Sequence, residues 1–315
     1  MLPLLLGSFI ISFSAVFVKL VQVPPTVSAF YRVFFGGLVL LAISLFGGHG
    51  RMRGAGNLGL GLVTALVFAL DLVCWHRAII LVGPGLATLL GNFQVPILAL
   101  VSLIFLREKL GARFWLALPL ALAGVACITG LTPGAYTPEV RLGIVFGLLT
   151  ALFYAAYILG LRRLLSRAGG HEPVAVQTMV TLATAAMLFL GAEVQGVPLS
   201  IPTTRDLLLL AGYGLFCQAL GWLLISRGLP RMKAAMAGLV ILVQPALSFV
   251  WDVLFFHRAF GPMEMLGAVL ALAGIYLGTT GRPESAPSLS AHPPAEQPGP
   301  SQAPDHAYLH KKLSP

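Results

Sequence analysis

The sequence predicts an all-α integral membrane protein in which ten transmembrane helices form two inverted five-helix repeats. Three observations favour this fold class. Hydrophobic residues make up 57% of the chain and charged residues only 10%, whereas a soluble domain carries about 25% charged residues. The pentapeptide Leu-Ala-Leu-Ala-Gly occurs at 120–124 and again at 270–274. Lys and Arg gather in alternate loops between the apolar runs, as the positive-inside rule describes.

Ten apolar runs are long enough to cross a membrane, because about 20 helical residues span about 30 Å of hydrocarbon. No basic residue precedes the first run, so we expect a retained helix there and no cleaved signal peptide. Runs five and ten carry almost no polar residue and should be peripheral supports. The ten runs are 3–22, 26–46, 57–81, 84–106, 112–131, 142–164, 173–194, 206–226, 234–255 and 262–280.

The second half of the chain repeats the first at a displacement of about 150 residues. An apolar run interrupted by Pro96 and followed by Arg107-Glu108-Lys109 precedes the first pentapeptide. A run interrupted by Pro245 and followed by His257-Arg258 precedes the second. Each proline removes a backbone hydrogen bond and should kink its helix. Their symmetric placement makes Pro96 and Pro245 candidate gating kinks, and a duplicated membrane protein of this kind suggests a transporter.

The distribution of basic residues predicts the orientation. If Met1 is cytoplasmic, the cytoplasmic loops hold eleven Lys and Arg and the opposite loops hold three. Both termini are therefore expected in the cytoplasm. Since five spans is an odd number, the second half enters the membrane inverted relative to the first. The eleven are Arg51, Arg53, Arg107, Lys109, Arg113, Arg162, Arg163, Arg167, Arg227, Arg231 and Lys233, and the three are Arg141, Arg205 and Arg258.

The predicted organisation has four parts. Residues 1–131 form the first repeat and 142–280 the second, and Pro and Gly mark an outer loop at 132–141 between them. The segment 281–315 is rich in proline and has no apolar period. It is expected to be a disordered cytoplasmic tail.

Other function classes find little support. The formal charge of +9 is scattered between apolar runs, which argues against a nucleic-acid surface. Cys74, Cys127 and Cys217 lie in apolar runs and are odd in number, so no disulfide framework is implied. No nucleotide-binding Gly-x-x-x-x-Gly-Lys-Ser/Thr motif occurs, and the spans offer no clustered carboxylates for a metal. We expect no enzyme and no cofactor, while a channel or a receptor stays open.

Candidate substrate-binding residues come from polar and aromatic side chains that share a helical face, at spacings such as i and i+4. Thr88 and Asn92 form one such stripe, and Gly214, Gln218 and Trp222 form another. Interhelical hydrogen bonding and packing remain the alternative roles for these side chains. The substrate-binding candidates are Trp75, His76, Asn92, Tyr154, Tyr157, Gln218, Trp222, Gln244 and Trp251.

An ionisable residue inside a membrane usually has a functional role or a charged partner, because burying a charge there is costly. Lys19 and Arg32 lie near the outer ends of their spans, where they can snorkel or form a basic mouth that attracts a carboxylate. Asp71 lies past the middle of its span and cannot snorkel. The sequence therefore predicts a buried charge pair or proton site at Asp71, Arg32 and Lys19.

The order, spacing and duplication of these features resemble the EamA family of the drug/metabolite transporter superfamily, over about residues 1–280. The resemblance implies ten-span transporters that move amino acids, their metabolites or drugs, commonly outward. It also implies a central cavity lined by spans one to four and six to nine. Among the branches, the sequence is most similar to the YddG-type amino-acid exporters. The residues that carry it are Lys19, Pro24-Pro25, Tyr31-Arg32, Gly85, Ala87, Pro96, Glu108 and Leu120 to Gly124; in the second copy His257 stands where the first has Glu108.

We therefore expect a secondary transporter that exports amino acids, aromatic or broadly neutral, by alternating access through a central cavity. An exporter of drugs or other metabolites and a channel-like uniporter are the alternatives. The expected partners are a small-molecule substrate and the lipid bilayer, without nucleic acid or metal. The expected form is a monomer in the bacterial inner membrane.

Overall fold

A computed structural model describes residues 1–47, 55–129, 137–168, 172–257 and 259–279 of the 315-residue chain. The described residues are helical, contain no strand, and belong to one compact unit, Met1–Gly281. Several sequence predictions fall outside them. These concern Arg51, Arg53, Arg258, residues 132–136 of the predicted outer loop and the tail from 281 onward.

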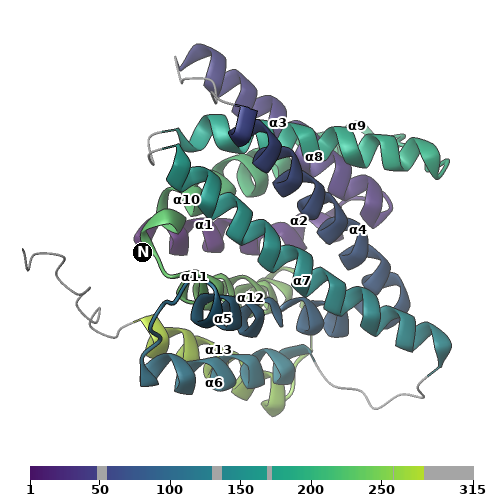
Figure 1. The fold of residues 1–315 in the computed structure, drawn as a ribbon. Coiled ribbons are helices and arrows are strands. Elements are labelled where there is room, and N and C mark those ends of the chain that lie inside the picture. The colour runs from purple at the N-terminus through teal and green to yellow at the C-terminus, as the bar shows by residue number, and fades with distance from the viewer. Residues whose placement is uncertain (48–54, 130–136, 169–171, 258, 280–315) are drawn as a thin grey trace, which may run out of the picture. The chain divides into compact units, whose positions relative to one another are not determined.

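Nine stretches of the described chain are helical, long and apolar enough to cross a membrane, and a tenth apolar helix, Ala112–Ile128, is shorter. A multi-pass helical membrane protein is thereby confirmed. The helices, several of them parts of one span, are α1 Leu2–Ser12, α2 Ser14–Leu20, α3 Pro25–Phe46, α4 Ala55–Gly91, α5 Gln94–Ile104, α6 Ala112–Thr129, α7 Pro138–Arg167, α8 Pro173–Val194, α9 Thr204–Tyr213, the π-helix η1 Gly214–Gly221, α10 Trp222–Gly228, the 3₁₀-helix η2 Leu229–Arg231, α11 Ala234–Ile241, α12 Val243–Phe256 and α13 Pro262–Thr279 (Figure 1). Helix α7 starts inside the range 132–141 that was expected to be a loop.

Both prolines lie just after a break in their span. Helices α4 and α5 are separated at 92–93, before Pro96, and α11 and α12 are separated at Leu242, before Pro245. A proline ring clashes with the carbonyl four positions earlier and supplies no N–H for it. The kinks expected from the sequence are therefore present, whereas their gating role stays a prediction.

Of three further irregularities in the spans, the one at Gly83 immediately precedes Pro84, and the other two have no proline beside them. The first span divides at Phe13, between α1 and α2. Within α4, Gly83 has a φ of 79°, which glycine adopts without strain and which ends the third span. Helix η1 is a π-helix. This form is rare in proteins overall, and where it occurs it is often at a functional site. These breaks change which side chains face the interior.

Helices α6 and α13, which carry the repeated pentapeptide, contact each other closely. A Cβ added to Gly124 would lie 2.2 Å from the backbone nitrogen of Ala271, and one added to Gly274 would lie 2.7 Å from that of Ala121. Residue numbers rise along one helix and fall along the other at this contact, so the two helices run antiparallel. The repeated pentapeptide thus forms a contact between the two helices, and its glycine allows the two backbones to approach closely.

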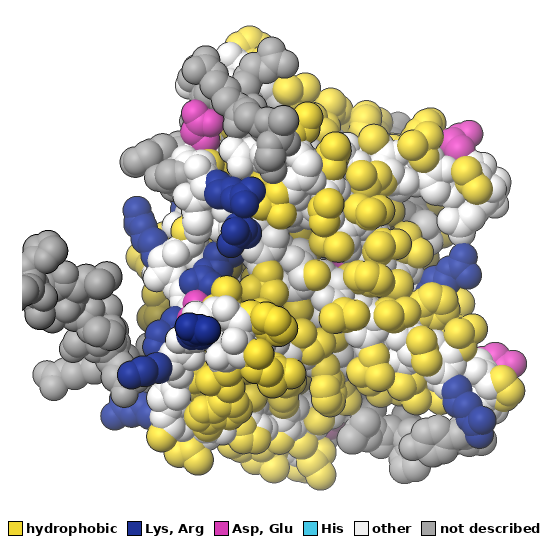
Figure 2. Space-filling model, viewed as in Figure 1, with side chains coloured by type: hydrophobic (Ala, Val, Ile, Leu, Met, Phe, Trp, Pro, Cys, Tyr) yellow, Lys and Arg dark blue, Asp and Glu magenta, His cyan; other side chains and the backbone are white. Residues whose placement is uncertain are grey.

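The surface of the described helices is largely apolar. Figure 2 shows a broad hydrophobic face across the helices, with Lys and Arg gathered at the end where the N-terminus lies. Large apolar side chains such as Leu116, Leu142 and Leu208 are exposed on different helices. Such continuous apolar exposure is unusual for a protein in water and suits lipid contact.

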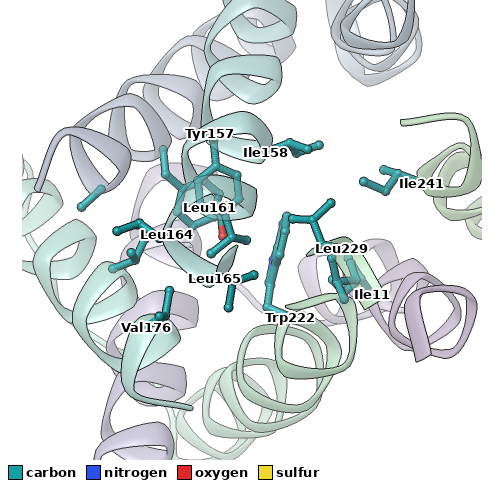
Figure 3. Packing of buried hydrophobic residues seen from close by; sticks show 14 of the residues in the cluster. Ile11, Tyr157, Ile158, Leu161, Leu164, Leu165, Val176, Trp222, Leu229 and Ile241 are labelled. Atoms are coloured by element: carbon teal, nitrogen blue, oxygen red, sulfur yellow. The ribbon is translucent and has the colours of Figure 1, made fainter. Parts of the chain in front are cut away.

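The largest hydrophobic cluster fills the part of the unit around the start of α1 and the end of α7. Trp222 lies between Tyr157 and Leu165 on one side and Ile11 and Leu229 on the other (Figure 3). Tyr157 and Trp222 are almost completely buried, at 0% and 1% exposure. The cluster is closely packed in that part of the described unit.

Candidate substrate cavity

A cavity of about 720 Å³ lies between the helices, next to this hydrophobic cluster. That volume is within the range of small-molecule sites, roughly 300–1,000 Å³. Its walls come from helices of both halves of the chain, namely α1, α2, α3, α4, α6, α7, α10 and α12.

One end of the cavity, which we call the open end, reaches the surface at Lys19. The Lys19 side chain lines the cavity and is 46% exposed. Its Nζ lies 2.7 Å from Oδ1 of Asp252, which also lines the cavity, and 5.0 Å from the centre of the Phe256 ring. A basic and an acidic group from the two halves of the chain therefore meet at the mouth.

Stacked aromatic rings form the floor of the cavity. Phe68 and Trp222 line it. Beneath them Tyr157 stacks on Phe68 with the ring centres 4.2 Å apart, and lies 4.9 Å from the Trp222 ring. The hydrophobic cluster of Figure 3 continues below these rings. The cavity is thus closed on the side of the N-terminus.

Polar contacts that we call the clasp hold this closed end together. Glu108, which follows α5, pairs with Arg162 of α7 at 2.8 Å, and its other oxygen accepts the Ala234 N–H at 3.0 Å. The Ser102 hydroxyl accepts the Ala235 N–H at 3.2 Å. Both amide donors are at the start of α11, where a helix leaves its N–H groups unsatisfied. The clasp therefore ties the end of α5 to α7 and α11.

Arg32 is a cation in the wall of the cavity, held from behind by neutral groups. It is buried, its Nε donates to Oε1 of Gln218 at 3.0 Å, and its Nη1 donates to the Tyr213 hydroxyl at 3.2 Å. Gln218 in turn donates to the Thr181 hydroxyl at 3.3 Å. The room for Gln218 depends on Gly36, where a Cβ would lie 2.5 Å from the Gln218 side chain. The guanidinium is therefore fixed in place without a paired carboxylate.

Asp71 is the buried acidic residue of the cavity. It is 6% exposed, lines the cavity, and has no hydrogen bond or ion pair with a described residue. It interacts with Arg32 electrostatically. A carboxylate that is taken out of bulk water without hydrogen-bond donors from the fold is costly, so this arrangement favours a ligand with a positive group.

The neutral polar groups of the wall offer both donors and acceptors. Asn92 donates to the Thr88 carbonyl at 2.9 Å, which leaves its oxygen available to a ligand. Gln244 lines the cavity, and its Nε2 has no hydrogen-bond partner among the described residues. His76 bonds through Nδ1 to the Leu72 carbonyl, so Nδ1 carries the proton and Nε2 is the free nitrogen.

The structure brings most of the candidate residues together at the cavity and leaves others out. Tyr157 lies beneath the floor, and Gln218 is behind Arg32. Trp251 donates to the Ser12 hydroxyl at 2.7 Å and stacks on Phe13, so its ring turns to the break in the first span. Pro96 is also outside the lining, whereas Pro245 is in it. The lining includes Trp75, His76, Asn92, Tyr154, Trp222, Gln244, Asp71, Arg32 and Lys19.

Several lining residues were not among the candidates. Thr88 and Thr150 share helical stripes with Asn92 and Tyr154, and this signal could have identified them. Phe68 carried no signal, because an apolar residue in an apolar run has no distinguishing pattern. The fifth span contributes Val125 and Ile128, so it is not merely peripheral, and no residue of the seventh span, α8, is in the lining.

No group of three or more His, Cys, Asp or Glu side chains within the described ranges is placed to hold a metal ion.

The fold and cavity define a polytopic membrane protein with a small-molecule chamber that is closed at one end. Comparison with known proteins is consistent with this class. A sequence model of the EamA-like transporter family matches residues 1–130 and 141–280, so the chain belongs to that family.

Two relatives extend the comparison. An uncharacterized transporter of Archaeoglobus fulgidus is 25% identical over 276 residues, which is 87% of this chain and 94% of that protein. A crystal structure of another protein matches with a TM-score of 0.74 at 20% identity, covering 88% of this chain and 96% of that one. The structural likeness supports the fold. Membership in a transporter family, from the sequence match, makes this protein a membrane transporter.

Proposed function

We propose that this transporter is a secondary exporter of amino acids, aromatic or broadly neutral, which it carries as zwitterions by alternating access. The single observation that carries the proposal is the set of charges in the cavity wall. Among the described residues, the lining holds two basic and two acidic side chains, Lys19, Arg32, Asp71 and Asp252, so their formal charges cancel. A net-neutral ligand with separated charges is therefore favoured over an organic cation or an anion.

Arg32 and Asp71 are the groups that suit a zwitterion. The Nη2 of Arg32 has no hydrogen-bond partner among the described residues and can donate to a carboxylate. Asp71 has no donor from the fold and can accept from an ammonium group. Asn92 and Gln244 add neutral amide groups to the wall of the same chamber. These groups extend the set expected from the sequence, and Gln218 acts as a support for Arg32.

Aromatic rings in the wall suit the side chain of such a substrate. Trp75, Tyr154 and Trp222 line the cavity together with Phe68. Ring faces bind apolar and aromatic groups with little demand on their exact shape. A broad range of neutral amino acids follows, as in the YddG-type exporters that the sequence resembles.

Contacts between equivalent helices support the inverted repeat. Helices α6 and α13 are the fifth spans of the two predicted repeats, and they run antiparallel. Gly124 of α6 lies against Ala271 of α13, and Gly274 of α13 lies against Ala121 of α6. The second spans, α3 and α8, also run antiparallel, since Gly37 faces Leu182 and Phe30 faces Phe189. Equivalent helices related by an axis along the membrane normal would be parallel. An axis in the membrane plane fits these contacts, and inverted repeats of this kind support alternating access.

The orientation can be tested by thiol labelling of a variant without native cysteines. Thr137→Cys, at the exposed start of α7, should react with an impermeant thiol reagent added outside cells. Ala168→Cys, at the other end of α7, should react only after permeabilisation, because the loops on its side carry most Lys and Arg. The reverse pattern would overturn the proposed orientation, in which the N-terminus is cytoplasmic. The assignment of export as the transport direction would then lose its support.

Transport itself can be tested in proteoliposomes loaded with a labelled aromatic amino acid. An unlabelled amino acid on the opposite side should accelerate exchange, and its decarboxylated amine and deaminated acid should compete about 10-fold less well or worse. The reason is that each analogue loses one charged contact, worth about 1.5–3 kcal/mol. Equal competition by the amine would favour an amine or drug exporter, and flux without counterflow or saturation would favour a channel-like uniporter.

A further inference from the structure

Gln94 is completely buried, and both polar atoms of its side chain lack a partner. Its exposure is 0%, and neither Oε1 nor Nε2 has a hydrogen-bond partner among the described residues. Leaving a buried amide unsatisfied costs free energy, so such a group in a folded protein needs an explanation. No described residue supplies a hydrogen bond that would explain a glutamine at this position.

The two halves of the fold correspond at a displacement of 150 residues. The kinked spans break at Asn92 and at Leu242, and the residues after these spans, Arg107 and His257, both have positive φ, 52° and 50°. This register pairs Arg107 with His257, and so corrects the sequence comparison, which paired Glu108 with His257. At 150 residues, the equivalent of Gln94 is Gln244.

These equivalent glutamines occupy different environments. Gln244 is half-buried and lines the cavity, although its Nε2 is buried, whereas Gln94 is completely buried and outside the lining. Their helices are likewise held differently at the far ends. The end of α5 is fixed by the clasp through Ser102, and the equivalent of Ser102 on α12 is Asp252, which pairs with Lys19 at the open end. The fold is therefore symmetric in sequence register and asymmetric in contacts.

We infer that Gln94 is a substrate-binding residue of the opposite access state, where it faces the cavity as Gln244 does here. Release of the clasp would separate the end of α5 from α11 and open the closed end. Gln94 would then meet water and substrate, while Gln244 would be enclosed. An exchange between two equivalent arrangements accounts for the unsatisfied Gln94 amide. The free energy lost by burying it without hydrogen bonds in this state is regained when it binds water or substrate in the other state. The inference rests on the proposed alternating access but not on the identity of the substrate.

Thiol labelling tests the inference without any substrate. In a variant lacking native cysteines, Gln244→Cys should react with an impermeant reagent only from the open end. Gln94→Cys should react slowly and only from the end of the clasp. Adding Glu108→Gln, which removes the charge that pairs with Arg162, should accelerate labelling of Gln94→Cys and slow that of Gln244→Cys. Ile275→Cys is the control, since Ile275 is 5% exposed on α13 and should stay unreactive in both states.

Sided kinetics give the second readout. Gln94→Leu should raise the half-saturation concentration for substrate added at the clasp end by about 3- to 10-fold, the range for one lost hydrogen bond. It should not raise that concentration at the open end. Gln244→Leu should do the reverse. A packing role alone would change both sides equally.

The outcomes separate this inference from the proposed function. If Gln94→Cys is unreactive from the clasp end even with Glu108→Gln, or reacts from the open end, the inference is overturned. If the labelling is sided as expected but no amino acid is transported, the inference stands and the substrate proposal falls.

Discussion

Replacing Asp71 by asparagine is expected to reduce amino-acid transport at subsaturating concentration by about 10- to 100-fold. Asp71 is the buried acidic residue of the cavity wall and has no hydrogen bond from the fold, so its interactions are available to an ammonium group. A hydrogen bond to a charged group is worth about 1.5–3 kcal/mol, which corresponds to this range. Counterflow in proteoliposomes measures the loss, and the deaminated acid should compete equally well with both proteins.

The same substitution should not destabilise the protein. Asparagine keeps the shape of Asp71 and removes a charge that the fold does not satisfy. Asp206 is a matched control with the opposite expectation. It is also buried, but its carboxylate accepts from the Gln22 N–H at 2.9 Å and from the Thr203 hydroxyl at 2.7 Å. Asp206→Asn should therefore lower the thermal midpoint in detergent and leave the half-saturation concentration unchanged.

Wild-type transport by Asp71→Asn would remove this residue from the substrate site. A large drop in its thermal midpoint would instead make Asp71 a structural partner of Arg32. The two aspartates thus distinguish a carboxylate held for the substrate from one held for the fold.

Replacing Gly124 by alanine is expected to lower the stability of the protein, because the added methyl group has no room between α6 and α13. The new Cβ would lie 2.2 Å from the Ala271 nitrogen and 2.6 Å from the Gly267 carbonyl oxygen, which are backbone atoms and cannot rotate away. The helices must separate, and overpacking of this kind costs about 1–3 kcal/mol or more. The thermal midpoint in detergent and the amount of protein in the membrane should both fall.

The chain offers a matched pair for this prediction. Gly274→Ala, the equivalent change on α13, should have a similar effect because its Cβ would meet the Ala121 nitrogen. Gly59→Ala should be neutral or stabilising, since Gly59 lies in α4 with no atom within 4 Å of the added Cβ and alanine favours helix. Equal stability of all three variants would show that the α6–α13 contact contributes little.

Much of the membrane architecture could be predicted from the sequence. The length and apolarity of the runs determined where helices cross, because unsatisfied backbone groups in lipid leave few alternatives to a helix. The prolines predicted the breaks before Pro96 and Pro245. Asp71 could be singled out because a charge deep in a span is costly and cannot reach the interface.

The faces of individual side chains were harder to predict. The stripe of Gly214, Gln218 and Trp222 assumed a regular α-helix, but η1 is a π-helix, which changes the angle between successive residues. Gln218 consequently contacts Arg32 while Trp222 lines the cavity. Trp251 donates a hydrogen bond to Ser12, at a break of the first span that no local sequence pattern predicts.

The sequence by itself determined the membrane class, the approximate helix boundaries, the 150-residue repeat and the set of ionisable residues inside the spans. These features depend on composition and local spacing, because partition into the membrane and helix formation are governed by short stretches of sequence. Only the tertiary structure decided that Arg32 is held by Gln218, that Asp71 has no hydrogen bond with a described residue, that the clasp joins α5 to α7 and α11, and that Gln94 is completely buried while Gln244 lines the cavity. Each of these depends on helices far apart in the chain meeting at one register. Two halves with similar local patterns can therefore hold different contacts, because those contacts depend on packing between distant helices and not on the local sequence.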